Sequence, residues 1–330
     1  MPNPTLFTPI TLRNLTIRNR VWVPPMCMYS ALGKDGIPTA FHTAHYGAMA
    51  LGGAGLIIVE ATAVNPEGRI SFHDLGIWND EQVAAFTPIT SFMSAQGVVP
   101  GIQLAHAGRK ASTYPGWGYD GIDGTVPVEE GGWKPLGPSA NAFTGYAQAE
   151  AMSEAQIAQV ITDFAAAARR AVEAGFQVLE IHAAHGYLIH EFLSPLSNER
   201  TDDFGGSPEN NIRIAKLVGE KVRAAIGPDK LLVLRLSQDG VDDFVGAWPG
   251  TDYAKAIGAA LKGSAYDALH WSSYNNHENR KDDDSTPMTV VLRAAAGLPM
   301  ITNGGIAEEP QTETPLTRRA AEKLAVGRGK

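Results

Sequence analysis

The sequence predicts an α/β protein of the (β/α)8 TIM-barrel class. Eight short apolar runs recur along the chain, each followed by glycine or polar residues and then by a helical pattern. The runs are apolar at consecutive positions, as expected of parallel strands that are buried on both faces. They span residues 20–28, 55–62, 101–106, 177–185, 231–237, 266–273, 298–305 and 323–329. No break in composition divides the 330 residues, and a barrel typically needs about 250, so we expect a single domain over residues 1–330.

Two helical patterns between these runs carry their own start and stop signals. Residues 153–175 begin with Ser153 three positions before Gln156, a capping-box spacing in which each side chain reaches the other's free backbone N–H. Residues 207–227 begin with serine and proline and end at glycine. Helices of this kind between buried strands are typical of a parallel barrel.

The residues beyond the minimum for a barrel fall in two segments. Residues 6–19 predict an N-terminal hairpin that turns at Arg13 and Asn14, and residues 111–150 form a long excursion after the third strand, rich in Gly, Pro, Trp and Tyr. A loop of that length in a compact fold is more often functional than idle. A doubly wound open sheet is the competing architecture, but no G-x-G-x-x-G motif follows the first strand.

The composition excludes several classes of function. A formal charge of −8 argues against nucleic acid or an anionic membrane surface as the main partner. The single cysteine, Cys27, excludes an internal disulfide framework and a cysteine-ligated cluster within one chain. The N-terminus lacks the apolar core of a signal peptide, and no run reaches the roughly 18 apolar residues of a membrane span. We therefore expect a cytoplasmic protein.

Polar or reactive residues stand at the carboxyl ends of nearly all predicted strands, where barrel enzymes place their active sites. The residues at these strand ends are Cys27, Tyr29, Ala61, Gln103, His106, His182, His185, Tyr187, Arg235, the glycines at 304–305 and residues 327–329. Glycines at the last two strand ends, with Arg328 beside them, predict a phosphate site, because bare N–H groups and a guanidinium bind anionic oxygens. Arg235 interrupts an apolar strand, so it requires either an internal ion pair or an anionic ligand. Gln103 could satisfy backbone groups or bind a heterocycle with a complementary donor and acceptor pattern.

His182, His185 and Tyr187 lie within six residues at the end of the fourth strand. A metal site is one interpretation, with His106 or Glu180 as further ligands. The favoured interpretation is that two neutral imidazoles donate hydrogen bonds to one substrate oxygen, while the tyrosine acts as a proton donor.

These residues belong to motifs that resemble one enzyme family, the old yellow enzymes, which are FMN-dependent ene-reductases. The matching stretches are PPMCMYS, LIIVEATAVNPEGRIS, GIQLAHAGRKAS and EIHAAHGYLIHEFLSPLSNERTDDFGGSPEN, which begin at residues 24, 56, 101 and 180. The Cys-Met-Tyr pattern at residues 27–29 resembles the branch called thermophilic-like. The resemblance is dense from about residue 5 to 240 and thin beyond.

The resemblance implies a flavin site and a substrate site. The residues implied for FMN are Pro24, Pro25, Met26, Cys27, Ala61, Gln103, Arg235, Gly305, Gly327 and Arg328. His182 and His185 are implied to hold the carbonyl or nitro oxygen of the substrate, Tyr187 to protonate its α-carbon, and Tyr29 to add a substrate contact. NADPH, or alternatively NADH, is implied as the hydride donor. The expected substrates are activated alkenes, namely α,β-unsaturated carbonyls or nitroalkenes.

The chain departs from the family pattern in several places, among them residue 211 and the C-terminal end. Asn211 stands where the family usually has arginine, which we expect to affect local packing. The sequence ends at VGRGK, whereas family members continue for some tens of residues and, in this branch, place an arginine in the neighbouring subunit's active site. A shortened end leaves a homo-oligomer open. One alternative function is therefore a barrel that binds flavin without efficient turnover. Another alternative is a metal-dependent barrel hydrolase or lyase.

Overall fold

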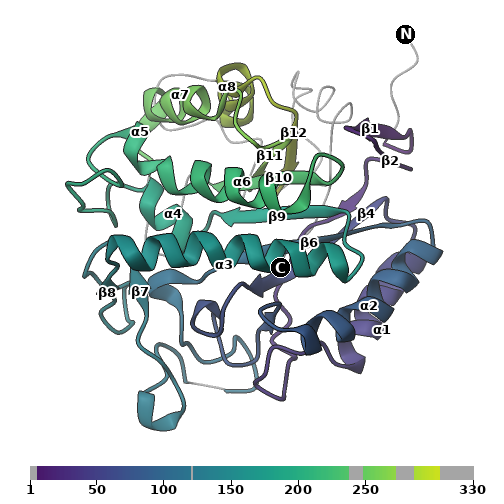
Figure 1. Cartoon of the computed structure of the whole chain (residues 1–330), viewed down its shortest axis with the longest axis horizontal. Helices are drawn as coiled ribbons and strands as arrows, with labels where there is room; N and C mark the ends of the chain where they lie inside the picture. Colours follow the sequence, from purple (N-terminus) through teal and green to yellow (C-terminus); the bar gives the residue numbers. More distant parts are fainter. Residues whose placement is uncertain (1–5, 120–121, 238–247, 273–285, 305–330) are drawn as a thin grey trace, which may run out of the picture.

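The computed structural model describes residues 6–119, 122–237, 248–272 and 286–304. Within these residues, seven parallel strands follow one another around a curled sheet, in the order β12-β11-β10-β9-β6-β4-β3 (Figure 1). Their bounds are β3 Trp22–Val23, β4 Leu56–Ala63, β6 Val99–Ala105, β9 Val178–Ala183, β10 Leu231–Ser237, β11 Ala268–Ser272 and β12 Met300–Asn303. The protein is a (β/α)8 barrel, as predicted. The predicted eighth strand, residues 323–329, lies outside the described residues.

The helices are α1 Ala40–Leu51, α2 Asp80–Ala95, α3 Glu154–Glu173, α4 Leu188–Leu193, α5 Pro208–Asn211, α6 Arg213–Ile226, α7 Gly250–Leu261 and α8 Met288–Ala296. The capping box of α3 is confirmed, since the Ser153 side chain accepts a hydrogen bond from the backbone of Gln156. The predicted helix over residues 207–227 is instead two helices, α5 and α6, which meet at Ile212. Asn211, the departure from the family pattern, donates a hydrogen bond of 2.8 Å to the Tyr253 hydroxyl of α7, so an amide contact fixes the packing there.

The N-terminal hairpin is confirmed as β1 (Ile10–Leu12) paired antiparallel with β2 (Leu15–Ile17). Its turn includes Arg13, whose φ of 50° lies in the left-handed region. Apolar side chains of the hairpin pack against Val178, Val233 and other buried apolar residues of the barrel interior. The hairpin therefore covers the amino-terminal end of the strands.

The predicted excursion after the third strand is also confirmed. Between β6 and α3 the chain forms the short helices η2 (Gly108–Lys110) and η3 (Val128–Glu130) and the paired strands β7 (Leu136–Gly137) and β8 (Glu150–Ala151). Two further short elements, η1 (Pro66–Gly68) and β5 (Leu75–Gly76), follow β4. These segments lie beyond the carboxyl ends of β4 and β6, where barrel enzymes have their active sites.

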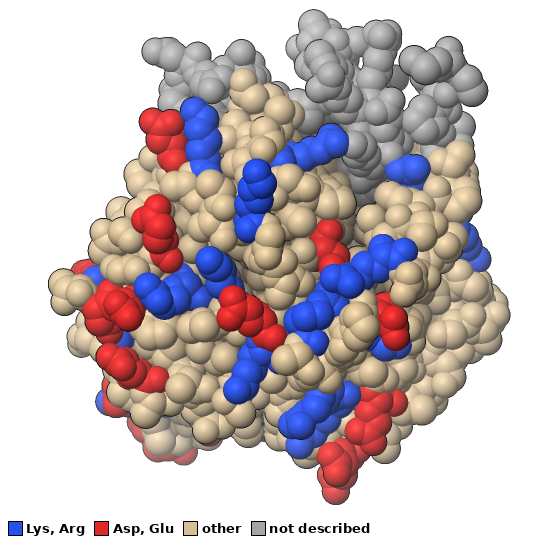
Figure 2. All heavy atoms as spheres, turned by 45° about the horizontal axis from the view of Figure 1, so that its top comes forward, with Lys and Arg blue, Asp and Glu red and all other residues tan. Residues whose placement is uncertain are grey.

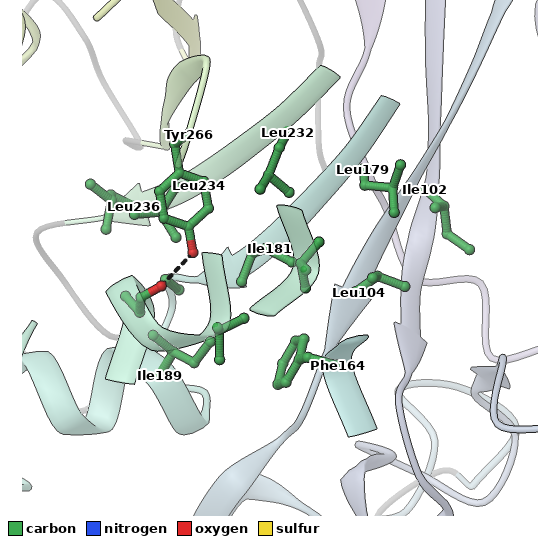
Figure 3. Close-up of a cluster of buried hydrophobic side chains, with 14 of the residues drawn as sticks. Ile102, Leu104, Phe164, Leu179, Ile181, Ile189, Leu232, Leu234, Leu236 and Tyr266 are labelled. Carbon is green, nitrogen blue, oxygen red and sulfur yellow. Dashed lines mark hydrogen bonds between the residues drawn. The ribbon is translucent and has the colours of Figure 1, made fainter. Parts of the chain in front are cut away.

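The main core lies between the outer face of the strands and the helices. In Figure 3, leucine and isoleucine side chains of β6, β9 and β10 face Phe164 of α3 and Ile189 of α4. The hydroxyl of Tyr266 donates a hydrogen bond of 2.6 Å to the carbonyl of Ala215 (Figure 3), so this aromatic ring is buried without an unpaired polar atom. Among the described residues, none of the helices is long and apolar enough to cross a membrane.

The inner face of the strands divides into two layers. Near the hairpin the inward residues are apolar, including Val178, Val233 and Ala268. Two residues further along each of these strands, the same face carries Glu180, Arg235 and His270. Successive residues of a strand point to opposite faces, so the carboxyl-terminal half of each strand directs its polar residue inward. The expectation of strands that are apolar on both faces therefore holds only for their amino-terminal halves.

Replacement of Phe164 by alanine tests the α3 contact with the sheet. The ring is fully buried, so its removal should lower the free energy of unfolding by about 3–5 kcal/mol. Phe92→Ala is the matched control. That ring is 39% exposed, so its removal should lower the free energy of unfolding far less. We propose that residues 1–330 are a single domain, and Phe164→Ala should then lower the midpoint of one thermal transition. A second transition that keeps the wild-type midpoint would contradict the single domain.

Candidate active site

Strand register brings the polar interior residues side by side. Gln103 of β6 lies directly opposite Glu180 of β9. Arg235 of β10 lies between His182 of β9 and His270 of β11. A shift in register between Val59 and Ala61 of β4 leaves Glu60 as an extra residue, and Ala61 then pairs with Gln103. Four strands thus contribute adjacent polar groups to one end of the barrel.

Glu180 joins two of these groups. One carboxylate oxygen accepts a hydrogen bond of 2.8 Å from Gln103 Nε2, and the other lies 2.6 Å from His270 Nδ1. All three side chains are buried. Although burial opposes ionisation, the neighbouring His270 and Arg235 and the bond from Gln103 hold the pKa of the Glu180 carboxyl below its ordinary value.

Arg235 contacts the first strand end and the sixth. Its Nη1 lies 3.5 Å from the carbonyl of Pro25, and its Nη2 donates to the Ser272 hydroxyl at 3.1 Å. Its Nε is buried and has no hydrogen-bond partner among the described residues. Burial lowers the pKa of the guanidinium, and the charge of Glu180 raises it. Arginine nevertheless remains charged in proteins, so the interior contains a fixed positive charge.

His182, His185 and Tyr187 are brought together as predicted. The imidazole rings of His182 and His185 lie 5.2 Å apart between centroids, and the Tyr187 ring lies 4.9 Å from that of His182. His185 has a φ of 60°, and its backbone N–H donates to the Ser237 hydroxyl at 2.8 Å, which holds the turn in place. Burial lowers the pKa of both histidines well below the ordinary value, so both imidazoles are neutral near pH 7.

Lys110 is a site residue that the sequence reasoning missed. Its ammonium group lies 4.8 Å from the centroid of the Tyr187 ring and donates to the carbonyl of His185 at 3.1 Å. It is buried, in the short helix η2 that follows β6. The available signal was its position in the motif GIQLAHAGRKAS, directly after a strand with a polar end.

Cys27, Tyr29, Ala61 and Tyr187 belong to one apolar cluster at this end of the barrel, with small alanine side chains between them. Burial raises the pKa of the Cys27 thiol, which therefore stays protonated. Tyr29 has a φ of 48°, and its ring packs edge-on against Trp117 at 5.0 Å. Before them in the chain, Pro24 and Pro25 are buried and Met26 is half-buried. The predicted phosphate residues Gly305, Gly327 and Arg328 lie outside the described residues.

Two other histidines of the region have separate contacts. His190, expected to be structural, bonds the backbone N–H of Gly186 at 3.0 Å and the carbonyl of Ser237 at 3.1 Å. His106, one of the considered metal ligands, accepts from the backbone of Gly108 at 3.1 Å. No group of three or more His, Cys, Asp or Glu side chains that could hold a metal ion occurs among the described residues.

The whole chain matches one family. Residues 5–329 match the model of the NADH:flavin oxidoreductase / NADH oxidase family, whose members bind FMN. The chain belongs to this family. It is an FMN-dependent oxidoreductase of the old yellow enzyme type, which confirms the resemblance found in the sequence motifs.

Curated relatives and solved structures agree with the family assignment. The NADPH dehydrogenase of Bacillus subtilis is 42% identical, over 92% of this chain and 86% of its own length. That of Bacillus cytotoxicus is 45% identical, over 99% and 89%. Morphinone reductase superposes with a TM-score of 0.78 at 27% identity, covering 99% of this chain and 86% of the reductase. An old yellow enzyme homologue from Zymomonas mobilis gives a TM-score of 0.75 at 30% identity, with coverage of 98% and 89%.

Glu191 of this family member provides a test of the electrostatics around the site. Its carboxylate is fully buried and accepts a hydrogen bond of 2.9 Å from the backbone of Arg109. Burial raises the pKa of the carboxyl to about 8, although the charge of Arg109 opposes the shift. The carboxyl of the unfolded chain loses its proton above about pH 4.5, whereas that of the native state keeps it up to about pH 8. The native state therefore binds one more proton than the unfolded chain in this range, and its stability falls as the pH rises through 8.

Replacement of Glu191 by glutamine should remove this loss. Between pH 7 and 9, wild-type stability should fall by about 1 kcal/mol more than that of the variant. The exposed Glu129→Gln should keep the wild-type slope. Denaturant titrations at several pH values measure the difference, and equal slopes for wild type and Glu191→Gln would contradict it.

Proposed function

We propose that the protein is an ene-reductase that reduces the activated C=C bond of α,β-unsaturated carbonyls or nitroalkenes. The observation that carries the proposal is the convergence of two neutral imidazoles and a half-buried phenol: the rings of His185 and Tyr187 lie 5.2 and 4.9 Å from that of His182. The names of the curated relatives support NADPH as the reductant, with NADH as the alternative.

The interior residues fit the isoalloxazine of FMN. The Gln103 amide donates one N–H to Glu180, which leaves a second N–H and the carbonyl oxygen for the donor and acceptor edge of the flavin pyrimidine. Arg235, with its buried Nε, is suited to the flavin edge where negative charge gathers on reduction. Pro24, Pro25, Met26, Cys27 and Ala61 supply apolar or weakly polar surface beside these groups. We propose that Gly305, Gly327 and Arg328 hold the phosphate.

When bound, FMN supplies a hydride from its N5 atom after reduction by a nicotinamide. His182 and His185 are proposed to donate hydrogen bonds to the carbonyl or nitro oxygen of the substrate, which makes its β-carbon electrophilic. Neutral imidazoles suit this role, since each keeps an N–H while adding no charge to a site that already contains Arg235. Tyr29 is proposed as a further substrate contact.

Tyr187 is proposed to protonate the α-carbon of the substrate. Burial raises the pKa of its phenol well above the ordinary value, so the proton is present throughout the neutral range. The nearby Lys110 ammonium favours the negative charge that develops on the phenol oxygen as the proton leaves. Tyr187 would thus donate the proton, and Lys110 would stabilise the negative charge that remains on the phenol oxygen.

The expected partner is a small activated alkene. On the face shown in Figure 2, Lys and Arg side chains are interspersed with Asp and Glu, in keeping with the overall charge of −8 and with a partner other than nucleic acid. We also propose a cytoplasmic location, on the basis of the single cysteine. A homo-oligomer stays a prediction, and sedimentation measures it directly.

Anaerobic absorbance spectroscopy tests the function. The flavin bands of the holoenzyme should bleach with NADPH and return on addition of 2-cyclohexenone. Tyr187→Phe keeps the ring and removes the proton, so it should slow the enone-dependent return by about 10²–10⁴-fold while the NADPH step changes little. Bleaching by NADPH without an enone-dependent return in wild type would overturn the ene-reductase assignment and favour flavin binding without turnover.

The same experiment at different pH values tests the protonation states. The lowered pKa values of His182 and His185 and the raised pKa of Tyr187 keep all three neutral from about pH 6 to about pH 9. The enone-dependent rate should therefore be flat across this range. Burial raises the pKa of Glu60 and of Asp74 to about 7. A roughly tenfold change in rate around pH 6.5 that disappears when His182 or His185 is replaced by asparagine would therefore contradict the neutral pair.

A further inference from the structure

Glu180 is an ionised carboxylate in the barrel interior, where burying a charge costs free energy. It lies on the inner face of β9, fully buried, one inward position below His182. The sequence motif contains it, yet the proposed hydride and proton steps do not use it. A buried carboxylate requires hydrogen bonds and a compensating charge, and Glu180 has both in Gln103, His270 and Arg235.

The contacts determine how each partner of Glu180 is oriented. A carboxylate only accepts hydrogen bonds, so the Gln103 amide must direct its nitrogen toward Glu180 and its oxygen away. His270 must present its Nδ1–H. Its Nε2 is buried without a partner among the described residues, which favours the neutral tautomer with an unprotonated Nε2, and burial lowers the pKa of this imidazole.

The charges around Glu180 nearly cancel. Arg235 contributes one positive charge and Glu180 one negative charge, while burial lowers the pKa of His182, His185 and His270. A flavin that gains electrons beside Arg235 is stabilised by the guanidinium and opposed by the carboxylate. The negative charge of Glu180 therefore lowers the tendency of the cofactor to be reduced.

We propose that Glu180 is a positioning residue for the flavin: it fixes the amide of Gln103 toward the pyrimidine edge and, as a buried anion, sets the reduction potential of the bound cofactor. The inference rests on the FMN assignment and on the proposed role of Gln103, and does not depend on the alkene substrate. It adds a third role to the motif that begins at residue 180, beside oxygen binding and proton donation.

Two substitutions separate the charge of Glu180 from its hydrogen bonds. Glu180→Gln removes the charge but keeps the chain of bonds, because the new amide can accept from Gln103 and donate to His270 in its other tautomer. The equilibrium constant for two-electron reduction of the FMN holoenzyme should rise about tenfold, equivalent to a shift of about 30 mV to more positive potential. Glu180→Asp keeps the charge but is one methylene shorter, so it cannot reach both partners. It should weaken FMN binding about tenfold and change the potential little.

The potential is measured with a reference dye in the absence of enone, and the FMN dissociation constant is measured by fluorescence titration of the apoprotein. Glu191→Gln is the matched control, since its carboxyl is already protonated at pH 7 and its replacement should leave the potential unchanged.

An unchanged potential in Glu180→Gln, or unchanged FMN affinity in Glu180→Asp, would overturn the proposal. If Glu180→Gln does not fold, the affinity of Glu180→Asp still decides the positioning role. The reduction potential and the FMN dissociation constant are both measured without enone. A wild-type protein that fails to reduce the enone would therefore refute the proposed function and leave the role of Glu180 intact.

Discussion

The structure around the site depends on one constraint, the cost of placing a charge inside a barrel. Arg235 interrupts β10, a strand otherwise rich in leucine and valine, and its guanidinium is almost fully buried. A charge in that position must be paired and hydrogen bonded. Glu180 supplies the opposite charge from the next strand, and Pro25 and Ser272 accept hydrogen bonds from the guanidinium. The polar interior is therefore a connected set, in which each member needs its neighbours.

The same constraint explains why the histidines are neutral. With Arg235 fixed as a cation in the buried interior, protonation of His182 or His185 would add a second buried positive charge. Both imidazoles consequently remain donors without becoming cations. In the proposed function, this arrangement gives directional hydrogen bonds to the substrate oxygen without adding a further charge beside Arg235 and Glu180.

Rigid strands set the positions of these groups, and loops add the remaining ones. His182, Arg235 and His270 lie at the same level of three parallel strands, and Glu180 lies one inward position below His182. Lys110 and Tyr187 come from the turns after β6 and β9, and their contact holds those two turns together. The outer face of the same strands packs against the helices, so the site and the core share one framework (Figure 3).

Much of this arrangement could be read from the sequence, because periodicity and caps are local. Eight apolar runs predicted a barrel, Ser153 and Gln156 predicted the start of a helix, and the motifs predicted a family that the comparisons confirm. The grouping of His182, His185 and Tyr187 followed from their proximity in the chain. Which face a polar strand residue occupies was less clear, since a short apolar run does not reveal its alternation. On sequence alone Glu180 therefore stays open as a metal ligand, whereas the positions of His270 and Lys110 in the site follow only from contacts between segments far apart in the chain.

The sequence by itself determined the fold class, the family and the residues able to carry the chemistry. Only the tertiary structure decided which of them meet: Gln103, Glu180 and His270 are far apart in the chain and come into contact across three strands. The same is true of the protonation states, since a pKa depends on burial and on charges supplied by other segments. Residue types are local properties of a chain, whereas register and desolvation exist only once the strands have assembled into a barrel.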